Sequence, residues 1–320
     1  MTKKDARITL AMPVYNGANF IAEAIESILA QTWTDFELII TDNASDDETP
    51  AIIERFAKAD ERVRYVRNER NIGAAANYNR GFELGSGEYL KWCAHDDRLS
   101  PNFLEACIAT LDADPSLAVA FASTTGIDLE GTEIVATGHE TQSILSDDAA
   151  QRFREAITMS GTCFPIFGVF RRDQLEKSTL HRSYYGSDRA LLAEMAIFGG
   201  FKRVDEAIFY NREHPVRSIN IDDKVARSKW QNGQASRLAA AEHINLARHL
   251  FEIARRHGDI ASPRRLRRVL WARSLRPREL GRYSLELTSM ISPKLAVGLK
   301  SAFSRPGPSS PNRHRQSTSH

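Results

Sequence analysis

Two adjacent carboxylates, Asp96 and Asp97, follow an apolar run that ends near Cys93. A strand that delivers paired aspartates to a sheet edge creates a small cluster of hard, anionic oxygens. Such a cluster binds Mg²⁺ or Mn²⁺ well when phosphate oxygens and water complete the coordination. The alternative is a polar strand-to-helix turn, in which Asp97 or Ser100 caps a helix that begins near Pro101. The rest of the chain must decide between these two interpretations.

The composition is typical of a soluble globular protein with a sizeable core. The chain has 320 residues, of which 42% are hydrophobic and 26% charged, enough for one large domain or two ordinary ones. The net charge of +2 gives no strong field that favours nucleic acid, although arginines crowd residues 248–282. The three cysteines, Cys93, Cys107 and Cys163, lack C-x-x-C spacing, which argues against disulfides and structural zinc and favours a reducing compartment.

The N-terminal region predicts no secretion or membrane insertion. Residues 1–7 include basic side chains, but no apolar segment of signal-peptide length follows them. No stretch of the chain approaches the length needed to span a bilayer. We therefore expect a cytoplasmic protein.

Short apolar runs alternate with helical patterns along the first third of the chain. Strands are predicted at 8–14, 36–41, 63–66 and 89–93, and helices at 18–30, from about 46, at 73–84 and at 101–111. Strands that alternate with helices of this length indicate βαβ units, and therefore an α/β fold with a mainly parallel, doubly wound sheet.

The pattern changes further along the chain. We expect strands within 117–135 around a turn at 128–132, a helix at 147–159, a strand at 168–170, a helix at 187–198 and a strand at 201–210. Beyond about residue 222 only helices with arginine-rich faces are predicted. The sequence thus predicts a domain over 1–221 with halves 1–112 and 113–221, a basic helical extension over 222–304 and a disordered tail over 305–320.

Polar residues follow each of the first four predicted strands. In an open parallel sheet, ligands bind outside the carboxyl ends of the strands, so residues 13–17, 42–47, 68–73 and 96–97 should converge. The chain has neither a G-x-G-x-x-G after its first strand nor a P-loop. Phosphates would instead be neutralised by a metal on the aspartate pair. Asp42 suits a hydrogen bond to a nucleobase or ribose, and its alternative is an Asx-turn or a cap.

Four segments in order, 12–16, 40–49, 68–81 and 87–97, resemble the family 2 glycosyltransferases. The likeness in spacing spans residues 8–111 and extends more weakly to about 218. It implies the GT-A fold, a Rossmann-like, mainly parallel sheet flanked by helices, here with a C-terminal helical extension. It also implies an inverting, Mg²⁺- or Mn²⁺-dependent transfer of a sugar to a hydroxyl of a glycan or glycolipid. UDP is the favoured donor nucleotide, with dTDP and GDP left open.

The resemblance implies which residues hold the donor. Contacts with the nucleotide sugar are expected from Pro13, Val14, Tyr15, Asn16, Asp42, Asn43, Asn71, Gly73, Asn77, Asp96 and Arg212. Metal ligands are expected to be Asp96, Asp97 and His214, although a solvated loop is an equal alternative for His214. The family often has a third acid just before the aspartate pair, where this chain has Ala94 and His95. This departure points to lower metal affinity or to coordination mainly by Asp97.

The second half should carry the acceptor side. Asp188, at the start of the predicted helix 187–198, corresponds to the catalytic base of the family, and Ser187 replaces an acid that often precedes it. A positioned carboxylate can take the proton of a sugar hydroxyl as the new bond forms. The alternative is that Asp188 only complements the helix dipole. Residues 160–168 are expected to line the acceptor pocket, with Cys163 as a packed side chain rather than a nucleophile.

Other interpretations stay open. A sugar-1-phosphate nucleotidyltransferase would need a Gly-rich, basic loop, which residues 15–19 do not form, and a non-catalytic nucleotide-sugar-binding protein would tolerate loss of Asp188. The arginine-rich region 248–282 suits an amphipathic helix on an anionic membrane, which would place the protein peripherally on the inner face of the plasma membrane. The alternatives are a solvated basic face packed on the domain, and nucleic-acid binding, which lacks an aromatic platform here.

Overall fold

The computed structural model describes residues 6–134, 141–159, 163–215, 217–234 and 240–292. The predicted tail at 305–320 and the end of the predicted extension lie outside these residues. Within them, the strands are β1 (Ile8–Val14), β2 (Phe36–Asp42), β3 (Val63–Arg67), β4 (Tyr89–Trp92), β5 (Arg98–Leu99), β6 (Leu117–Ile127), β7 (Glu133–Ile134), β8 (Val169–Arg171) and β9 (Gly200–Arg212). They form one mixed sheet of order β3-β2-β1-β4-β8-β6-β9-β5, with β7 paired to β6.

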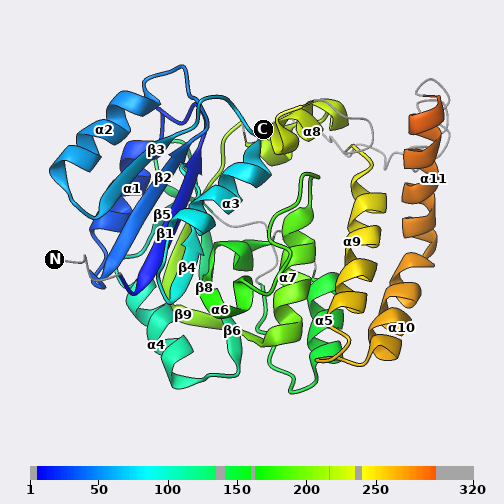
Figure 1. Ribbon diagram of the computed structural model, residues 1–320. Coiled ribbons are helices and arrows are strands. Elements are labelled where there is room, and N and C mark those ends of the chain that lie inside the picture. Colours follow the sequence, from blue (N-terminus) through cyan, green and yellow to red (C-terminus); the bar gives the residue numbers. More distant parts are fainter. Residues whose placement is uncertain (1–5, 135–140, 160–162, 216, 235–239, 293–320) are drawn as a thin grey trace, which may run out of the picture.

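Helices cover both faces of this sheet and extend it at one end (Figure 1). The α-helices are α1 (Ile21–Leu29), α2 (Thr49–Ala59), α3 (Ala74–Leu84), α4 (Phe103–Ala113), α5 (Ala149–Thr158), α6 (Arg172–Leu175), α7 (Ser187–Phe198), α8 (Lys224–Asn232), α9 (Glu242–Arg256), α10 (Pro263–Ser274) and α11 (Pro277–Ile291). Two short 3₁₀ helices, η1 (Phe164–Phe167) and η2 (Ser218–Asn220), complete the described elements.

The first half of the sheet has the predicted parallel arrangement. Strand β1 pairs in parallel with β2 and β4, and β2 pairs in parallel with β3. Every residue of β1 is buried, because the strand is covered on both faces. Leu10 and Met12 pack in the core that contains Ile25 of α1, whereas Ala11 lies in the opposite core and meets Gly81 of α3. The predicted α/β class is confirmed.

The second half of the sheet is mixed. Strand β8 runs antiparallel to both β4 and β6, while β6 and β9 are parallel and β5 is antiparallel to β9. The predicted turn at 128–132 connects β6 to β7, with the Gly131 nitrogen donating to the Asp128 carbonyl at 3.2 Å. Because β9 lies between β6 and β5, its last residues reach the loop that carries the paired aspartates.

The interpretation of Asp97 or Ser100 as a helix cap is wrong. Helix α4 begins at Phe103 without a side-chain cap, and the Ser100 hydroxyl instead accepts a hydrogen bond from the Ile208 nitrogen at 2.9 Å. The Asp97 carboxylate is directed toward β9, which lies more than 100 residues further along the chain.

Helices α9, α10 and α11 form the end of the molecule opposite β3 (Figure 1). Leu246, Leu250 and Ile253 of α9 pack in the same core as the apolar residues of α7. Leu266 and Leu270 of α10 belong to this core too, so α9 and α10 are integral to the fold rather than a free appendage. None of the described helices is long and apolar enough to cross a membrane.

Candidate active site

The ends of β1 and β2 are joined by a polar network around Asn16. Its backbone nitrogen donates to the Ser45 hydroxyl at 2.9 Å, and its side chain exchanges two hydrogen bonds with Asp46. Asn16 adopts a positive φ of 52°, a conformation that asparagine tolerates better than most residues. Pro13 and Val14 are buried, whereas Tyr15 is exposed. The predicted donor-side residues of these two loops therefore share one edge of the sheet.

Asp42 is fully buried at the end of β2. One carboxylate oxygen accepts from the Ser45 nitrogen at 2.9 Å, a local bond to the backbone three residues on, which is related to the Asx-turn considered from the sequence. The other oxygen accepts from the Tyr65 hydroxyl at 2.9 Å and from the Arg67 guanidinium at 2.7 Å. A nucleoside could reach this carboxylate only by exchanging with one of these partners, of which Arg67 is the more exposed.

A cluster of asparagine side chains ties the turn before α3 to β2. Asn43 donates to the Asn71 side chain at 2.9 Å and accepts from the Asn68 side chain at 3.0 Å. Asn77 donates to the Thr41 carbonyl at 2.7 Å and also accepts from Asn68. These amides hold the turn that ends at Gly73, whose φ of 85° favours glycine.

Asp96 and His214 come together after β4 and β9. The His214 Nε2 atom lies 2.8 Å from Asp96 Oδ2, while the buried Nδ1 atom has no hydrogen-bond partner among the described residues. Burial would raise the pKa of Asp96, but the charge of His95 and the hydrogen bond from His214 outweigh it and hold the pKa at about 2. Asp96 is therefore ionised at neutral pH, and His214 is a side chain of the site rather than of a solvated loop.

Asp97 is oriented differently from its neighbour. Its Oδ1 atom accepts from the Asn211 side chain at 3.1 Å and from the Arg212 nitrogen at 2.8 Å. Burial, reinforced by the charge of Asp96, raises the pKa of Asp97 well above its usual range. Arg217, which donates to Asn211 at 2.9 Å, opposes this increase. Arg217, which was not predicted as a site residue, thus supplies positive charge close to Asp97.

Arg212 is completely buried beneath the site. Its guanidinium donates to the carbonyl oxygens of Asp96, Asp128 and Leu129 at 2.8–2.9 Å, and it forms an ion pair with Glu23 of α1. These contacts fix the backbone of Asp96 rather than present a cation to the solvent. Glu23 was not singled out from the sequence, because its helical spacing resembles that of any polar position on α1.

The donor set around Asp96 fits a divalent cation. Carboxylate oxygens and one imidazole suit Mn²⁺ or Mg²⁺ when phosphate and water supply the remaining ligands. Because Asp97 faces β9, the three expected ligands do not lie close enough together to share one ion. Among the described residues, such a group of three occurs at Glu242, His243 and Glu286 of the helical extension.

That second group already has a structural explanation. Glu286 accepts hydrogen bonds from the His243 and Ile244 nitrogens at the start of α9 and pairs with Lys224 at 2.8 Å. Glu242 pairs with Arg227 at 2.8 Å. The carboxylates are therefore compensated by protein cations and by the helix terminus.

Asp188 lies in the first turn of α7, after Gly186 in the left-handed conformation. Its carboxylate accepts from the Arg189 nitrogen at 2.9 Å and from the Cys163 thiol. Burial raises the pKa of Asp188. Burial also raises the pKa of Tyr78 on α3, and the charges of Asp96, Asp97 and Asp188 add to this increase. The charges of all three carboxylates therefore contribute to the raised pKa of Tyr78, a residue that no sequence pattern singled out.

The loop before Asp188 is held by a chain of buried polar groups. The Tyr184 hydroxyl lies 2.9 Å from His249 Nδ1, and His249 Nε2 lies 2.7 Å from the Thr179 hydroxyl. That hydroxyl donates to Glu194 of α7 at 2.5 Å. Arg182 also forms two hydrogen bonds to Glu252 of α9 at 2.6 and 2.9 Å. Helix α9 thus positions the loop that leads to Asp188.

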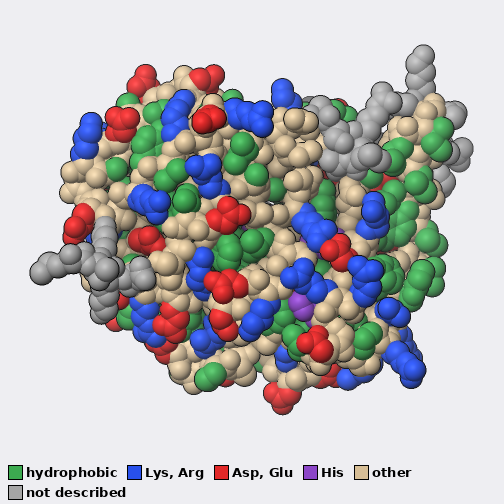
Figure 2. Space-filling model, viewed as in Figure 1, with side chains coloured by type: hydrophobic (Ala, Val, Ile, Leu, Met, Phe, Trp, Pro, Cys, Tyr) green, Lys and Arg blue, Asp and Glu red, His purple; other side chains and the backbone are tan. Residues whose placement is uncertain are grey.

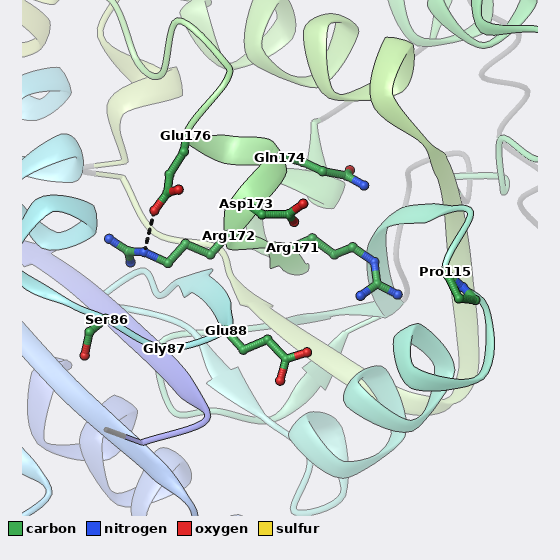
Figure 3. A pocket seen from close by; sticks show the side chains of 9 residues that line it. All are labelled: Ser86, Gly87, Glu88, Pro115, Arg171, Arg172, Asp173, Gln174 and Glu176. Carbon is green, nitrogen blue, oxygen red and sulfur yellow. Dashed lines mark hydrogen bonds and ion pairs between the residues drawn. The ribbon is translucent and has the colours of Figure 1, made fainter. Parts of the chain in front are cut away.

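A separate hollow lies at the other end of β4. It is lined by Ser86, Gly87, Glu88, Pro115, Arg171, Arg172, Asp173, Gln174 and Glu176 (Figure 3). Glu88 precedes β4, whereas the aspartate pair follows it. The Arg172 side chain turns to Glu176 at 3.2 Å, and Arg171 donates to the Leu117 carbonyl at 2.8 Å. These arginines serve the fold, and the hollow does not belong to the candidate active site.

The fold and the site define an α/β protein with ionisable groups at the carboxyl ends of its parallel strands. Residues 9–177 match the family described as Glycosyl transferase family 2, and the chain belongs to this family. It is similar to S. aureus TarS 1–349 in complex with UDP-GlcNAc, with a TM-score of 0.55 and 17% identity over 92% of this chain and 83% of that chain. This likeness confirms the predicted GT-A fold.

Two curated relatives are more similar in sequence. Chondroitin synthase of Escherichia coli is 31% identical over 248 residues, which cover 75% of this chain and 34% of that protein. GalNAc(5)-diNAcBac-PP-undecaprenol beta-1,3-glucosyltransferase of Campylobacter jejuni is 27% identical over 191 residues, 58% of each chain. The chain thus matches less than two thirds of the length of these relatives.

Proposed function

We propose that the protein is an inverting glycosyltransferase that moves a sugar from a nucleoside diphosphate, with UDP favoured, to a hydroxyl group of a glycan or glycolipid. The proposal is supported by the contact of Asp96, after β4, with His214, after β9, and by Asp188 in the first turn of α7; the charges of Asp96, Asp97 and Asp188 all add to the effect of burial in raising the pKa of Tyr78. Membership of Glycosyl transferase family 2 supports the reaction class. The UDP-GlcNAc complex of TarS supports the donor class.

The donor is proposed to lie across the carboxyl ends of β1, β2 and β4. The nucleoside would contact Pro13, Val14, Tyr15, Asn16, Asp42, Asn43, Asn71, Gly73 and Asn77, and the diphosphate would lie toward Asp96, with Arg212 holding the backbone of that residue. Mg²⁺ or Mn²⁺ held by Asp96 and His214 would neutralise the negative charge of the departing diphosphate, and Asp97 would join these ligands by turning its carboxylate away from β9. The mutual repulsion of two neighbouring carboxylates favours a cation at this position.

Asp188 is proposed as the general base. Its carboxylate takes the proton of the acceptor hydroxyl while the acceptor oxygen forms a bond to the anomeric carbon. The bond from that carbon to the diphosphate breaks, and the nucleoside diphosphate leaves with the electron pair. A pKa raised by burial makes Asp188 a stronger base than an exposed aspartate. One displacement at the opposite face of the sugar inverts its configuration.

Replacement of Asp188 by asparagine tests this assignment. We expect transfer to fall by about 100-fold or more while the dissociation constant of the UDP-sugar changes less than about threefold. Asp173→Asn is the matched control, because Asp173 lies in the first turn of α6, away from the site. Undiminished transfer by Asp188→Asn would refute the base. Production of pyrophosphate from UTP and a sugar 1-phosphate would instead indicate a nucleotidyltransferase.

The donor can be identified by thermal shift. A nucleotide sugar above its dissociation constant raises the Tm, so UDP-, dTDP- and GDP-sugars can be compared with and without Mn²⁺.

We propose a cytoplasmic location with peripheral contact to the inner face of an anionic membrane. The name of the Campylobacter jejuni relative includes an undecaprenol-linked acceptor, which supports a lipid-linked acceptor for this chain. Residues 1–221 are proposed as the catalytic domain.

A further inference from the structure

The outermost helices of the molecule carry a strong local positive charge. Residues 263–292 contain eight arginines and two glutamates, a net charge of +6 in a chain whose total is +2. Both glutamates are buried and paired, Glu279 with Arg282 at 2.9 Å and Glu286 with Lys224 at 2.8 Å. Within residues 263–292, therefore, no carboxylate is exposed to offset the arginines.

Helix α10 separates its buried and exposed side chains cleanly. Leu266, Leu270 and Ser274 are buried against the core, whereas the opposite side of the helix is exposed. We call this exposed side the α10 outer face; it comprises Arg264, Arg267, Arg268 and Trp271, together with Leu275, the residue that follows the helix. Most of these positions recur every three or four residues, so they form a stripe along the helix.

The α10 outer face combines unpaired cations with exposed apolar groups. Among the described residues, Arg264, Arg267 and Arg268 have no ion-pair partner. Trp271 is 55% exposed and Leu275 is 59% exposed. The Trp271 ring packs edge-on against the Phe251 ring of α9, with ring centroids 5.2 Å apart, and this contact holds the exposed indole in place. A supported indole beside arginines is typical of a protein surface that meets lipid headgroups.

Helix α11, which follows α10 in the chain, carries an exposed apolar stripe. Leu280, Leu287 and Ile291 are exposed at helical spacing along α11. Figure 2 shows hydrophobic side chains gathered along α11 at the right edge of the molecule, with Lys and Arg side chains near its lower end. Aliphatic side chains of this kind can enter the boundary between headgroups and acyl chains.

We propose that the α10 outer face and the apolar stripe of α11 dock on an anionic lipid bilayer surface. Charge and apolar complementarity favour an anionic bilayer over the other binding partners that this surface could have. The following segment, 293–320, contains five lysines and arginines and no carboxylate, so it cannot neutralise the face. A second copy placed symmetrically would oppose arginine with arginine. Nucleic acid would satisfy the charge but not the aliphatic side chains, and one tryptophan makes a poor stacking platform.

The arginines give this docking its lipid specificity. Each arginine near an anionic membrane surface contributes roughly 1 kcal/mol, which corresponds to about fivefold in affinity. Replacing Arg264, Arg267 and Arg268 together by glutamine should therefore weaken binding by about 100-fold. Removal of the Trp271 and Leu275 side chains should weaken it by about tenfold or more. Added salt should weaken the wild-type interaction, because exposed charges are screened.

Vesicle co-sedimentation of the full chain tests the proposal. Phosphatidylcholine vesicles with and without phosphatidylglycerol are compared for the wild type, for R264Q/R267Q/R268Q and for W271A/L275A. The matched control is R55Q/K58Q/R64Q, which removes three exposed cations from α2 and β3 at the other end of the molecule. Unchanged circular dichroism and Tm establish that each variant is folded.

Selective binding to phosphatidylglycerol vesicles that both face variants lose, and that the control keeps, would support the proposal. It is overturned by equal binding to neutral and anionic vesicles, or by face variants that bind like the wild type. It is also overturned if the protein does not bind vesicles. In that case, binding to RNA would indicate a nucleic-acid surface, and self-association that W271A/L275A abolishes would indicate an interface between copies of the chain. The assay involves no sugar transfer, so its outcome is independent of the proposed activity.

Discussion

His249 is expected to make the stability of the protein depend on pH. Burial, and secondly the charge of Arg182, lowers the pKa of His249 to about 4, against about 6.5 in an unfolded chain. The neutral imidazole is compatible with the hydrogen bonds that link Tyr184, His249 and Thr179. It can accept a hydrogen bond from the Tyr184 hydroxyl at Nδ1 and donate one to Thr179 from Nε2. Protonation would add a proton at Nδ1 and force the tyrosine hydroxyl to turn.

The sign of the effect follows from proton uptake. Below about pH 6.5 the unfolded chain gains a proton at His249, whereas the folded chain gains it only near its depressed pKa. The free energy of unfolding should therefore decrease as the pH falls through this window. Between about pH 8 and about pH 5, a folded pKa of about 4 corresponds to a loss of about 2 kcal/mol from His249 alone.

His249→Gln isolates this contribution. Glutamine cannot titrate and cannot bond both neighbours, so we expect a loss of about 1 kcal/mol at about pH 8 and a weaker dependence on pH. The unfolding free energies of the two proteins should then cross as the pH approaches 5. His181, whose burial also lowers its pKa to about 4, is common to both proteins and cancels in the comparison.

Urea denaturation of the wild type and the variant at both pH values measures the effect. Arg248→Gln is the control, because Arg248 is the exposed neighbour of His249 on α9. Parallel stability curves for the wild type and His249→Gln would show that this imidazole does not titrate between the folded and unfolded states as argued.

Three further outcomes are expected. Gly73→Ala should lower the free energy of unfolding by more than about 2 kcal/mol in urea denaturation, because φ is +85° and the new Cβ would overlap the backbone at the end of α8. Gly186→Ala, where φ is +88° but the surrounding space is open, should cost only about 1 kcal/mol in the same assay. Arg152→Met should cost about 3 kcal/mol in thermal or urea melts, because the buried guanidinium donates to four carbonyl oxygens, two of them at the end of α7. Asp96→Asn and His214→Ala should each weaken UDP binding about tenfold or more in Mn²⁺ but not in chelator; equal effects by calorimetry in both buffers would contradict the metal assignment.

Local patterns predicted the elements that carry the donor side. The alternation of apolar runs with helical spacing placed β1 to β4 and their helices, because each signal depends only on residues close together in the chain. The same patterns directed attention to Asp96, Asp188 and His214, which end strands or begin a helix. The turn at 128–132 was also recognisable, from the Asp and Gly in its sequence.

The tertiary structure decided which of these side chains meet and what they do. Asp97 turns to β9, and Arg212 bonds the carbonyl of Asp96 from more than 100 residues away, so neither orientation has a signal in the nearby sequence. The link from Tyr184 through His249 likewise joins a loop to α9 across 65 residues. The reason is physical: periodicity records whether a position faces the core, whereas hydrogen-bond partners are selected by the packing of distant elements.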